Sequence, residues 1–443
     1  MYRRGFLKTL SIGGSLGWLG SAEAQERDPS GSGSLDLSSY PIIDVHVHPP
    51  ERMTLSESHA QWNGSFVDAL LPAYDYPGKE DARAKLGVTF REHLYRLPRE
   101  TGMKNYMARV YGVEPTLQGI DSVPARHKDG DYVAYVRSIL DREKIDALVL
   151  QSRGTEPVRP EVLVPQERFV WTYSITHLIQ PDWARERGHE EVEEVARAIE
   201  AILENAKSNA CVGLKIPIAY YRSLTVENVT RAQADRDLQA LLTHEPSAYR
   251  NHPTKNPLYD DPALTASLRS YQDYLLKRIY VRAGELSLRI IIHSAVALHP
   301  ALRFDYNSPL GLYQVFQDDD IKRAGTTFVL IHAAYPYHHH VAAFLSQFPN
   351  VYADVSFYSN FPGTLEEILR AFLGLAPSEK IMHGSDSGSI AENIGYCAFN
   401  IRQVLAKVLA DYRGHYGWTE KDCETMARNV LSENARRVYE IGA

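Results

Sequence analysis

Eight short apolar segments, separated by longer stretches with helical spacing, constrain the fold of this chain more than any other feature. Each segment is rich in β-branched residues and about four to eight residues long, which is typical of a parallel strand buried on both faces. Eight such strands, each followed by a helix, close an α/β barrel. The sequence therefore predicts an α/β fold, a (β/α)8 TIM barrel, with strands at residues 41–47, 146–151, 169–175, 211–216, 288–293, 327–332, 350–355 and 380–384.

Two connections between the predicted strands are too long for ordinary barrel loops. Residues 49–140 are expected to form a helical cap inserted after the first strand, and residues 217–262 a second excursion after the fourth. Long insertions at the carboxyl ends of barrel strands usually shape a substrate pocket. Residues 41–443 are therefore expected to form one elaborated barrel.

The first 24 residues have the pattern of a targeting segment. The run RRGFLK at residues 3–8 precedes a weakly apolar, glycine-rich stretch, and residues 22–24 form an A-x-A cleavage site. This pattern predicts a twin-arginine signal peptide, so the twin-arginine export machinery is an expected partner and the periplasm the expected location. A membrane anchor is the alternative, although the apolar stretch is shorter than the ~20 residues that span a bilayer. Residues 25–40 are expected to be a linker.

Composition and charge exclude several classes of partner. The 443 residues are 44% apolar and carry a formal net charge of -7, with both signs mixed along the chain and no basic stripe. Nucleic acid is therefore not an expected partner, and no later segment is long and apolar enough to span a membrane. A small molecule is the expected ligand, and the sequence leaves the oligomeric state open.

The sharpest chemical motif is the end of the first predicted strand, Asp44-Val45-His46-Val47-His48. Because successive side chains of a strand point to opposite faces, His46 and His48 point to the same side and can reach one ion. Imidazole suits zinc and its first-row neighbours. If the motif is taken alone, two structural histidines at a strand end are the alternative interpretation.

Three further predicted strands also run into a histidine or an aspartate. They deliver His293, His332 and Asp386 to the rim that already carries the first pair of histidines. This is the face on which barrel enzymes place their active sites. A single histidine at such a position is more often structural, but the same pattern on four strands favours a shared metal site.

Several segments together resemble the amidohydrolase superfamily, specifically its amidohydrolase-related branch. They cover most of the chain after the linker and read DVHVH, VGLK, IIIHSA, FVLIHAAYPY, NVYADVS, HGSDS and ENARRVY. The resemblance implies a divalent metal, with zinc expected, bound by His46, His48, His293 and Asp386. It implies that His332 is either a catalytic acid/base or a ligand of a second metal.

The reaction that the resemblance implies is hydrolysis of a C–N, ester or lactone bond of a small molecule. A divalent metal lowers the pKa of bound water from about 15.7 to about 7. Asp386 would be the catalytic group that takes the proton of this water.

Two alternatives to hydrolysis stay open. The branch also contains metal-dependent, nonoxidative decarboxylases of unsaturated or aromatic acids, and the barrel could be a non-catalytic periplasmic binding protein, which a complete ligand set disfavours.

Two residues near the fourth predicted strand bear on the number of metals and on substrate binding. Lys215 resembles a lysine that is carbamylated in some members and bridges two metals, and an ordinary rim lysine is the alternative. One bound ion is favoured. Two ions would need carbamylated Lys215, with His293 and His332 binding the second ion.

Arg222 lies in a segment similar to the AYR segment of amidohydrolase domains fused to glutamine-synthetase-like domains. It is a candidate to bind a substrate carboxylate, with a structural ion pair as the alternative.

Overall fold

A parallel sheet of eight strands forms the centre of the protein in the computed structural model, which describes residues 35–71, 76–152, 154–244, 262–300 and 302–442. The strands follow one another around the sheet in chain order, as in a (β/α)8 barrel. All eight predicted strands are confirmed, and each boundary lies within two residues of its predicted position. They are β1 (Ile42–Val47), β2 (Ile145–Gln151), β3 (Phe169–Ser174), β4 (Cys211–Ile216), β5 (Arg289–His293), β6 (Phe328–Ile331), β7 (Val351–Asp354) and β8 (Ile381–Met382).

The barrel closes between β1 and the segment after β8 through individual hydrogen bonds. The Asp386 N–H donates to the His46 carbonyl at 2.8 Å, and the His48 N–H donates to the Ser387 carbonyl at 2.7 Å. Val47 and Ser387 form an isolated parallel bridge. The closing contacts therefore involve the same short segments that carry three of the predicted metal ligands.

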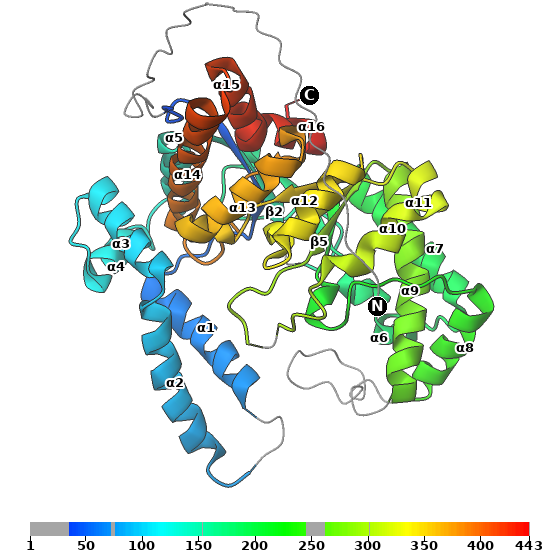
Figure 1. Ribbon diagram of the computed structural model, residues 1–443. Helices are drawn as coiled ribbons and strands as arrows, with labels where there is room; N and C mark the ends of the chain where they lie inside the picture. Colours follow the sequence, from blue (N-terminus) through cyan, green and yellow to red (C-terminus); the bar gives the residue numbers. More distant parts are fainter. Residues whose placement is uncertain (1–34, 72–75, 153, 245–261, 301, 443) are drawn as a thin grey trace, which may run out of the picture.

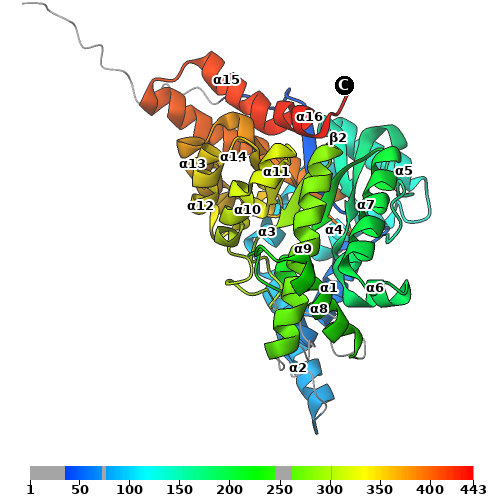
Figure 2. The same cartoon turned by 90° about the vertical axis from the view of Figure 1, so that its right-hand side faces the viewer.

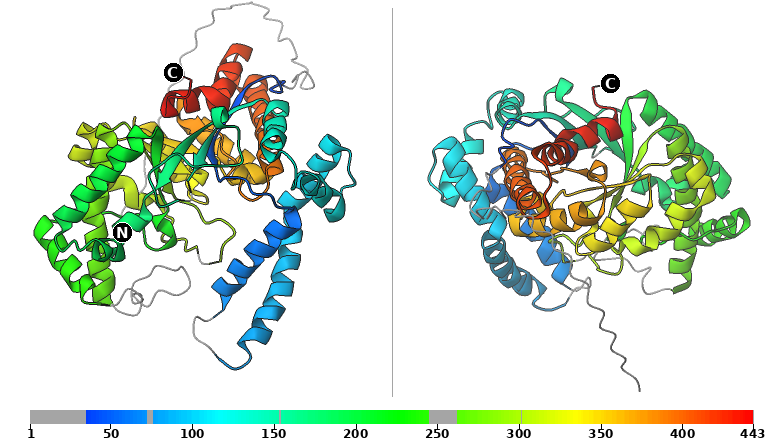
Figure 3. Two further views of the ribbon diagram at one scale, coloured as in Figure 1. Left: turned by 180° about the vertical axis from the view of Figure 1, so that it is seen from behind. Right: turned by 45° about the horizontal axis from the view of Figure 1, so that its top comes forward.

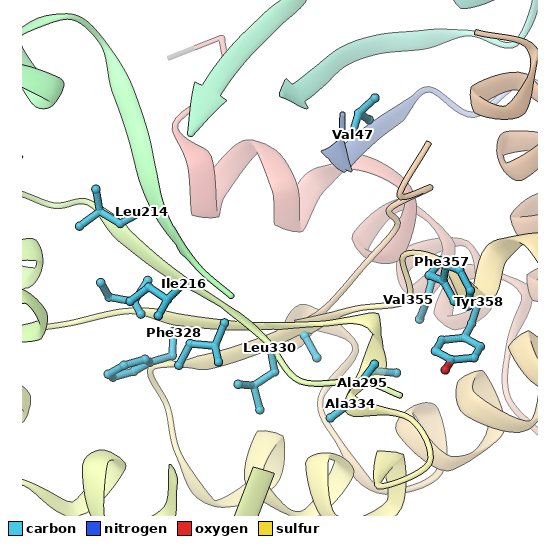
Figure 4. Close-up of a cluster of buried hydrophobic side chains, with 14 of the residues drawn as sticks. Val47, Leu214, Ile216, Ala295, Phe328, Leu330, Ala334, Val355, Phe357 and Tyr358 are labelled. Atoms are coloured by element: carbon cyan, nitrogen blue, oxygen red, sulfur yellow. The ribbon is translucent and has the colours of Figure 1, made fainter. Parts of the chain in front are cut away.

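Alternate side chains of the strands pack into two apolar layers. Leu214, Ile216, Phe328 and Leu330 belong to the layer between the strands and the surrounding helices, part of which is drawn in Figure 4. Their sequence neighbours point to the opposite face, into the barrel. The inner layer contains Ile43, Val45, Ala147, Val149, Ile291, Val329, Ile331 and Met382, and it is completed by Ala435, Val438 and Tyr439 near the end of the chain.

The described part of the long connection after β1, which excludes residues 72–75, folds into five helices. They are α1 (Leu55–Leu70), α2 (Lys79–Tyr95), α3 (Pro98–Tyr111), α4 (Leu117–Ala125) and α5 (Tyr132–Arg142). A capping box between Thr54 and Glu57 starts α1. Helices α1 and α2 form a hairpin that projects from the barrel, at the end opposite to α16 (Asn434–Tyr439), as Figure 1 and Figure 2 show.

The remaining helices cover the outside of the sheet (Figure 3). The second long connection lies partly outside the described residues, and its described part contains α8, which packs against α9. The remaining helices of the described residues, apart from short 3-10 and π-helical turns, are α6 (Pro181–Glu186), α7 (Val192–Ser208), α8 (Arg231–Leu242), α9 (Pro262–Glu285), α10 (Tyr313–Gln317), α11 (Asp319–Arg323), α12 (His338–Gln347), α13 (Pro362–Leu375), α14 (Glu392–Tyr416) and α15 (Glu420–Arg428).

The predicted signal peptide and most of the predicted linker, residues 1–34, lie outside the described residues. Within the part of the chain that the structure describes, no helix combines the length and the apolar character needed to cross a bilayer.

Candidate metal centre

The predicted metal ligands converge at the carboxyl ends of β1, β5, β6 and β8. Asp386 Oδ1 lies 3.2 Å from His46 Nε2 and 3.4 Å from His48 Nε2. The ring centroid of His332 lies 5.3 Å from that of His46 and 4.9 Å from that of His293. The fold thus brings the four predicted ligands and the candidate acid/base His332 into one cluster.

Three of these side chains form the tightest group. One ligand atom each from His46, His332 and Asp386 lies within 4.8 Å of the other two. Zinc binds nitrogen and oxygen ligands at about 2.0–2.2 Å, so small side-chain movements would let these three atoms share one ion. His48 and His293 contact members of this group from either side. His332 is therefore close enough to act as a ligand as well as an acid/base.

Burial keeps His46, His293 and His332 neutral, which is the form that binds metal. It lowers the pKa of His46 and of His293 to about 3, with a smaller contribution from the positive charge of Lys215. Burial also lowers the pKa of His332. Burial alone would raise the pKa of Asp386, but the neighbouring imidazoles hold it well below its usual value. The cluster therefore offers neutral imidazoles and one ionised carboxylate, a donor set that fits a divalent metal.

Two of the histidines have their outer ring nitrogen fixed by a second contact. His293 Nε2 lies 3.1 Å from the carbonyl oxygen of Ala295. His332 Nδ1 lies 2.8 Å from Ser356 Oγ, and the Ser356 hydroxyl donates to Asp354. Contacts of this kind orient a ligand ring and select its tautomer, which leaves the other nitrogen for the metal.

Sequence reasoning missed Asp354 and Ser356, although a signal for them was present. Asp354 is the last residue of β7, and Ser356 follows two residues later in a turn. The signal was thus two polar side chains at the carboxyl end of a predicted apolar strand. Tyr220 was also missed. Its ring lies 4.5 Å from that of His293, and it ends the short helix η3 (Ile218–Tyr220), where no sequence pattern marks it.

Two site residues have a left-handed backbone conformation that is uncommon for residues other than glycine. The φ angle is 60° at His332 and 55° at Asp386. Hydrogen bonds hold both residues in place, because the His332 N–H donates to Asp354 Oδ1 at 2.9 Å and the Asp386 N–H donates to the His46 carbonyl. Strain of this kind, about 1–3 kcal/mol per residue, clusters at functional sites.

Lys215 lies inside the cluster. It is 3% exposed, and its Nζ lies 3.2 Å from His46 Nε2. Burial lowers its pKa to about 8, although the charges of Asp386 and Asp354 act in the opposite direction. Lys215 is thus close enough to the predicted ligands to affect how many ions they bind.

Arg222 is buried away from the cluster. It forms an ion pair with Asp273 at 2.5 Å, and it donates to the carbonyl oxygens of Thr225 and Arg269. It does not line the pocket beside the predicted ligands. This arrangement gives no support to the predicted contact with a substrate carboxylate. It favours the alternative, a structural ion pair that holds the chain after β4 against α9.

We expect Arg222→Met to destabilise the protein. The substitution would leave the Asp273 carboxylate, which is 1% exposed, buried without its partner. Removing one member of a buried ion pair costs about 3–5 kcal/mol. Denaturant unfolding should show this decrease in the free energy of unfolding, and the double variant Arg222→Met/Asp273→Leu should recover part of it. A normal free energy of unfolding with a raised KM would instead indicate a substrate contact.

A pocket of about 410 Å³ opens beside the cluster, within the usual size range of small-molecule sites. His48 and Asp386 line it on the side of the cluster. Its other walls come from α1, from η3, from the loop after β5 and from the segments that follow β7 and β8. They are formed by Gln61, Trp62, Ser65, Phe66, Tyr220, Ala297, Leu298, His299, Leu302, Phe357, Gly388 and Ser389.

Comparisons with known sequences match the part of the chain that contains most of the cluster. A family model described as amidohydrolase matches residues 184–441, which include Lys215, His293, His332 and Asp386. Protein fluG from Emericella nidulans is 25% identical over 269 residues. The match covers 56% of this chain but only 28% of the length of that relative.

Solved structures of similar fold cover nearly the whole chain. A protein from Lactobacillus casei, described as a metal-dependent hydrolase, has a TM-score of 0.65 at 17% identity, covering 92% of this chain and 98% of the other. A uronate isomerase from Thermotoga maritima has a TM-score of 0.61 at 14% identity, covering 91% and 95%. A glucuronate isomerase from Caulobacter crescentus has a TM-score of 0.62 at 12% identity, covering 92% of each chain. At these identities the likeness shows the fold alone.

Proposed function

We propose that this chain, which belongs to the amidohydrolase family, is a metal-dependent hydrolase that cleaves a C–N, ester or lactone bond of a small molecule. The observation that carries the proposal is the convergence of His46, His332 and Asp386, flanked by His48 and His293, beside an open pocket. Zinc is the proposed ion because the donors are imidazoles and a carboxylate.

The protein's own residues supply the proton transfers. An ion in this cluster would lower the pKa of bound water to about 7 and so supply hydroxide at neutral pH. Asp386 is the proposed acceptor of the proton of the attacking water, which is supported by its low pKa and by its position in the pocket lining. It can then pass this proton to the leaving group. His332, oriented by Ser356, is the second group able to exchange a proton with the substrate.

A substrate screen tests the reaction class. Zinc-loaded and manganese-loaded protein would be offered amides, lactones and carboxylated aromatic acids, with hydrolysis and carbon dioxide release both measured. We expect hydrolysis without carbon dioxide. Release of carbon dioxide with no hydrolysis would contradict the proposal in favour of decarboxylation. Unchanged ligand binding by metal-free protein, with no turnover, would indicate a binding protein instead.

We propose one ion per chain and expect the same metal content with and without Lys215. A lysine ammonium is repelled by a nearby dication, whereas a carbamate formed from the lysine and carbon dioxide could bridge two ions. The measurement is the metal-to-protein ratio of wild type and Lys215→Ala after reconstitution with bicarbonate, with bicarbonate-free samples as the control. A ratio of one in both proteins is expected. A ratio of two in wild type that falls to one or fewer in the variant would contradict a single-ion site.

We also propose export by the twin-arginine route, on the basis of the RRGFLK run and the A-x-A site in the first 24 residues. The conservative double variant Arg3→Lys/Arg4→Lys should keep the protein in the cytoplasm with its signal uncleaved. Fractionation and mass spectrometry of the amino terminus would show this. Normal periplasmic recovery of the double variant, cleaved after Ala24, would contradict the proposed route.

A further inference from the structure

The pocket beside the metal centre has an apolar wall that the barrel itself does not supply. Trp62 and Phe66 of α1 form this wall. Leu298 and Leu302, from the loop after β5, and Phe357, which follows β7, continue the apolar lining. A helix of the connection after β1 therefore determines which chemical groups the pocket can hold away from the predicted ligands.

Contacts with the loop after β5 hold α1 at the pocket. His299 Nε2 lies 3.0 Å from Ser65 Oγ, and the rings of His299 and Phe66 form a T-shaped contact at a centroid distance of 5.0 Å. On the other side, the Phe66 ring packs against Phe90 of α2 at 5.3 Å. Phe66 is 6% exposed. Contacts with the loop after β5 and with α2 therefore fix the position of Phe66 in the apolar wall.

The pocket lining carries little charge. Among the described residues that line it, none is a lysine or an arginine, and Asp386 is the sole carboxylate. Lys215 is buried within the cluster and Arg222 is paired with Asp273. The Arg99 guanidinium lies 5.5 Å from the centre of the Trp62 ring, but Arg99 does not line the pocket. A carboxylate bound against the apolar wall would lose part of its hydration without contacting a cationic side chain of the lining, which is costly.

We propose that the substrate carries an uncharged aromatic or branched apolar group, which Trp62, Phe66 and the loop after β5 hold while the reacting bond lies at the metal centre. The inference rests on the proposed function only for the position of the reacting bond. The pocket volume of about 410 Å³ accommodates such a group, and the burial of its apolar surface would drive binding. The same argument disfavours a substrate that places a carboxylate against this apolar wall.

Hydroxamates test this inference, because the hydroxamate group chelates zinc whether or not the compound is turned over. Calorimetry with the zinc-loaded full chain would compare acetohydroxamate, benzohydroxamate and para-carboxybenzohydroxamate. We expect benzohydroxamate to bind at least about tenfold more tightly than acetohydroxamate. We expect the para-carboxylate to weaken its binding at least about tenfold.

Variants of α1 test which residues make the preference. Trp62→Ala and the milder Phe66→Leu should each reduce the preference for benzohydroxamate over acetohydroxamate to less than about threefold. Val88→Ala removes an apolar side chain from α2 that is 50% exposed and does not line the pocket, so it should leave the preference unchanged. The zinc content of each variant would be measured first.

Each outcome bears on one of the two proposals. Equal affinity for benzohydroxamate and acetohydroxamate would overturn the apolar-group inference, as would an unweakened para-carboxylate or an unchanged preference in both α1 variants. None of these results would affect the proposed hydrolase. If no hydroxamate bound at full zinc content, the proposed metal-centred function would fail, and this inference with it.

Discussion

His46→Ala is expected to lose its bound metal almost completely and its turnover with it. His46 is 3% exposed, and its Nε2 lies 3.2 Å from Asp386 Oδ1, so the substitution removes a ligand from the tightest group of the cluster. Without the ion, the water nucleophile returns to a pKa of about 15.7, and turnover should fall at least about 1,000-fold. Elemental analysis of the purified variant, with a steady-state assay, measures both effects.

A control substitution at a histidine outside the cluster shows whether the loss of metal is specific to the predicted ligands. His415→Ala removes an exposed histidine near the end of α14 and should retain full metal content and turnover. His293→Ala should behave like His46→Ala, because both remove predicted ligands of the same ion. Full metal occupancy in either ligand variant would exclude the proposed cluster as the metal site.

Asp386→Asn is expected to lower kcat far more than it changes KM. Asparagine keeps the shape of the side chain but cannot accept the proton of the attacking water. General acid–base groups contribute about 100-fold to 10,000-fold to rate, so kcat should fall by that factor, while KM should stay within about threefold. The measurement is a steady-state comparison with the substrate that the screen identifies.

Metal content decides how the Asp386→Asn result is interpreted. Asparagine can still offer a ligand oxygen, and His46, His48 and His293 remain in place, so the variant should retain metal after reconstitution at high zinc concentration. A loss of turnover at full occupancy then reports the missing proton acceptor. Wild-type turnover in the variant would remove Asp386 from the mechanism.

The strands can be predicted from the sequence because barrel strands are buried on both faces. A segment such as Arg289–His293 (RIIIH) is apolar between polar ends, so its position is visible without tertiary information. β8 is the least regular case. The prediction for residues 380–384 covers a strand of two residues, Ile381–Met382, because the chain then leaves the regular ladder to make the contacts that close the barrel.

The predicted ligands can be located from the sequence because each stands near the carboxyl end of a strand. The surroundings of the cluster cannot be located in the same way. The orientation of Arg222 depends on Asp273, which lies 51 positions further along the chain. The role of Phe66 in the pocket depends on how α1 packs against His299. Local patterns carry no information about such contacts.

The hydrogen bonds that close the barrel also set the order in which the metal centre can form during folding. Asp44 accepts a hydrogen bond from the Ser385 N–H, a contact between residues 341 positions apart. We expect contacts of such sequence separation to form late, because a very large loop must close before they can be made. A chain with β5 and β6 already paired would hold only His293 and His332. Bound metal would therefore mark chains whose folding is complete, and it would stabilise most strongly the junction that forms last.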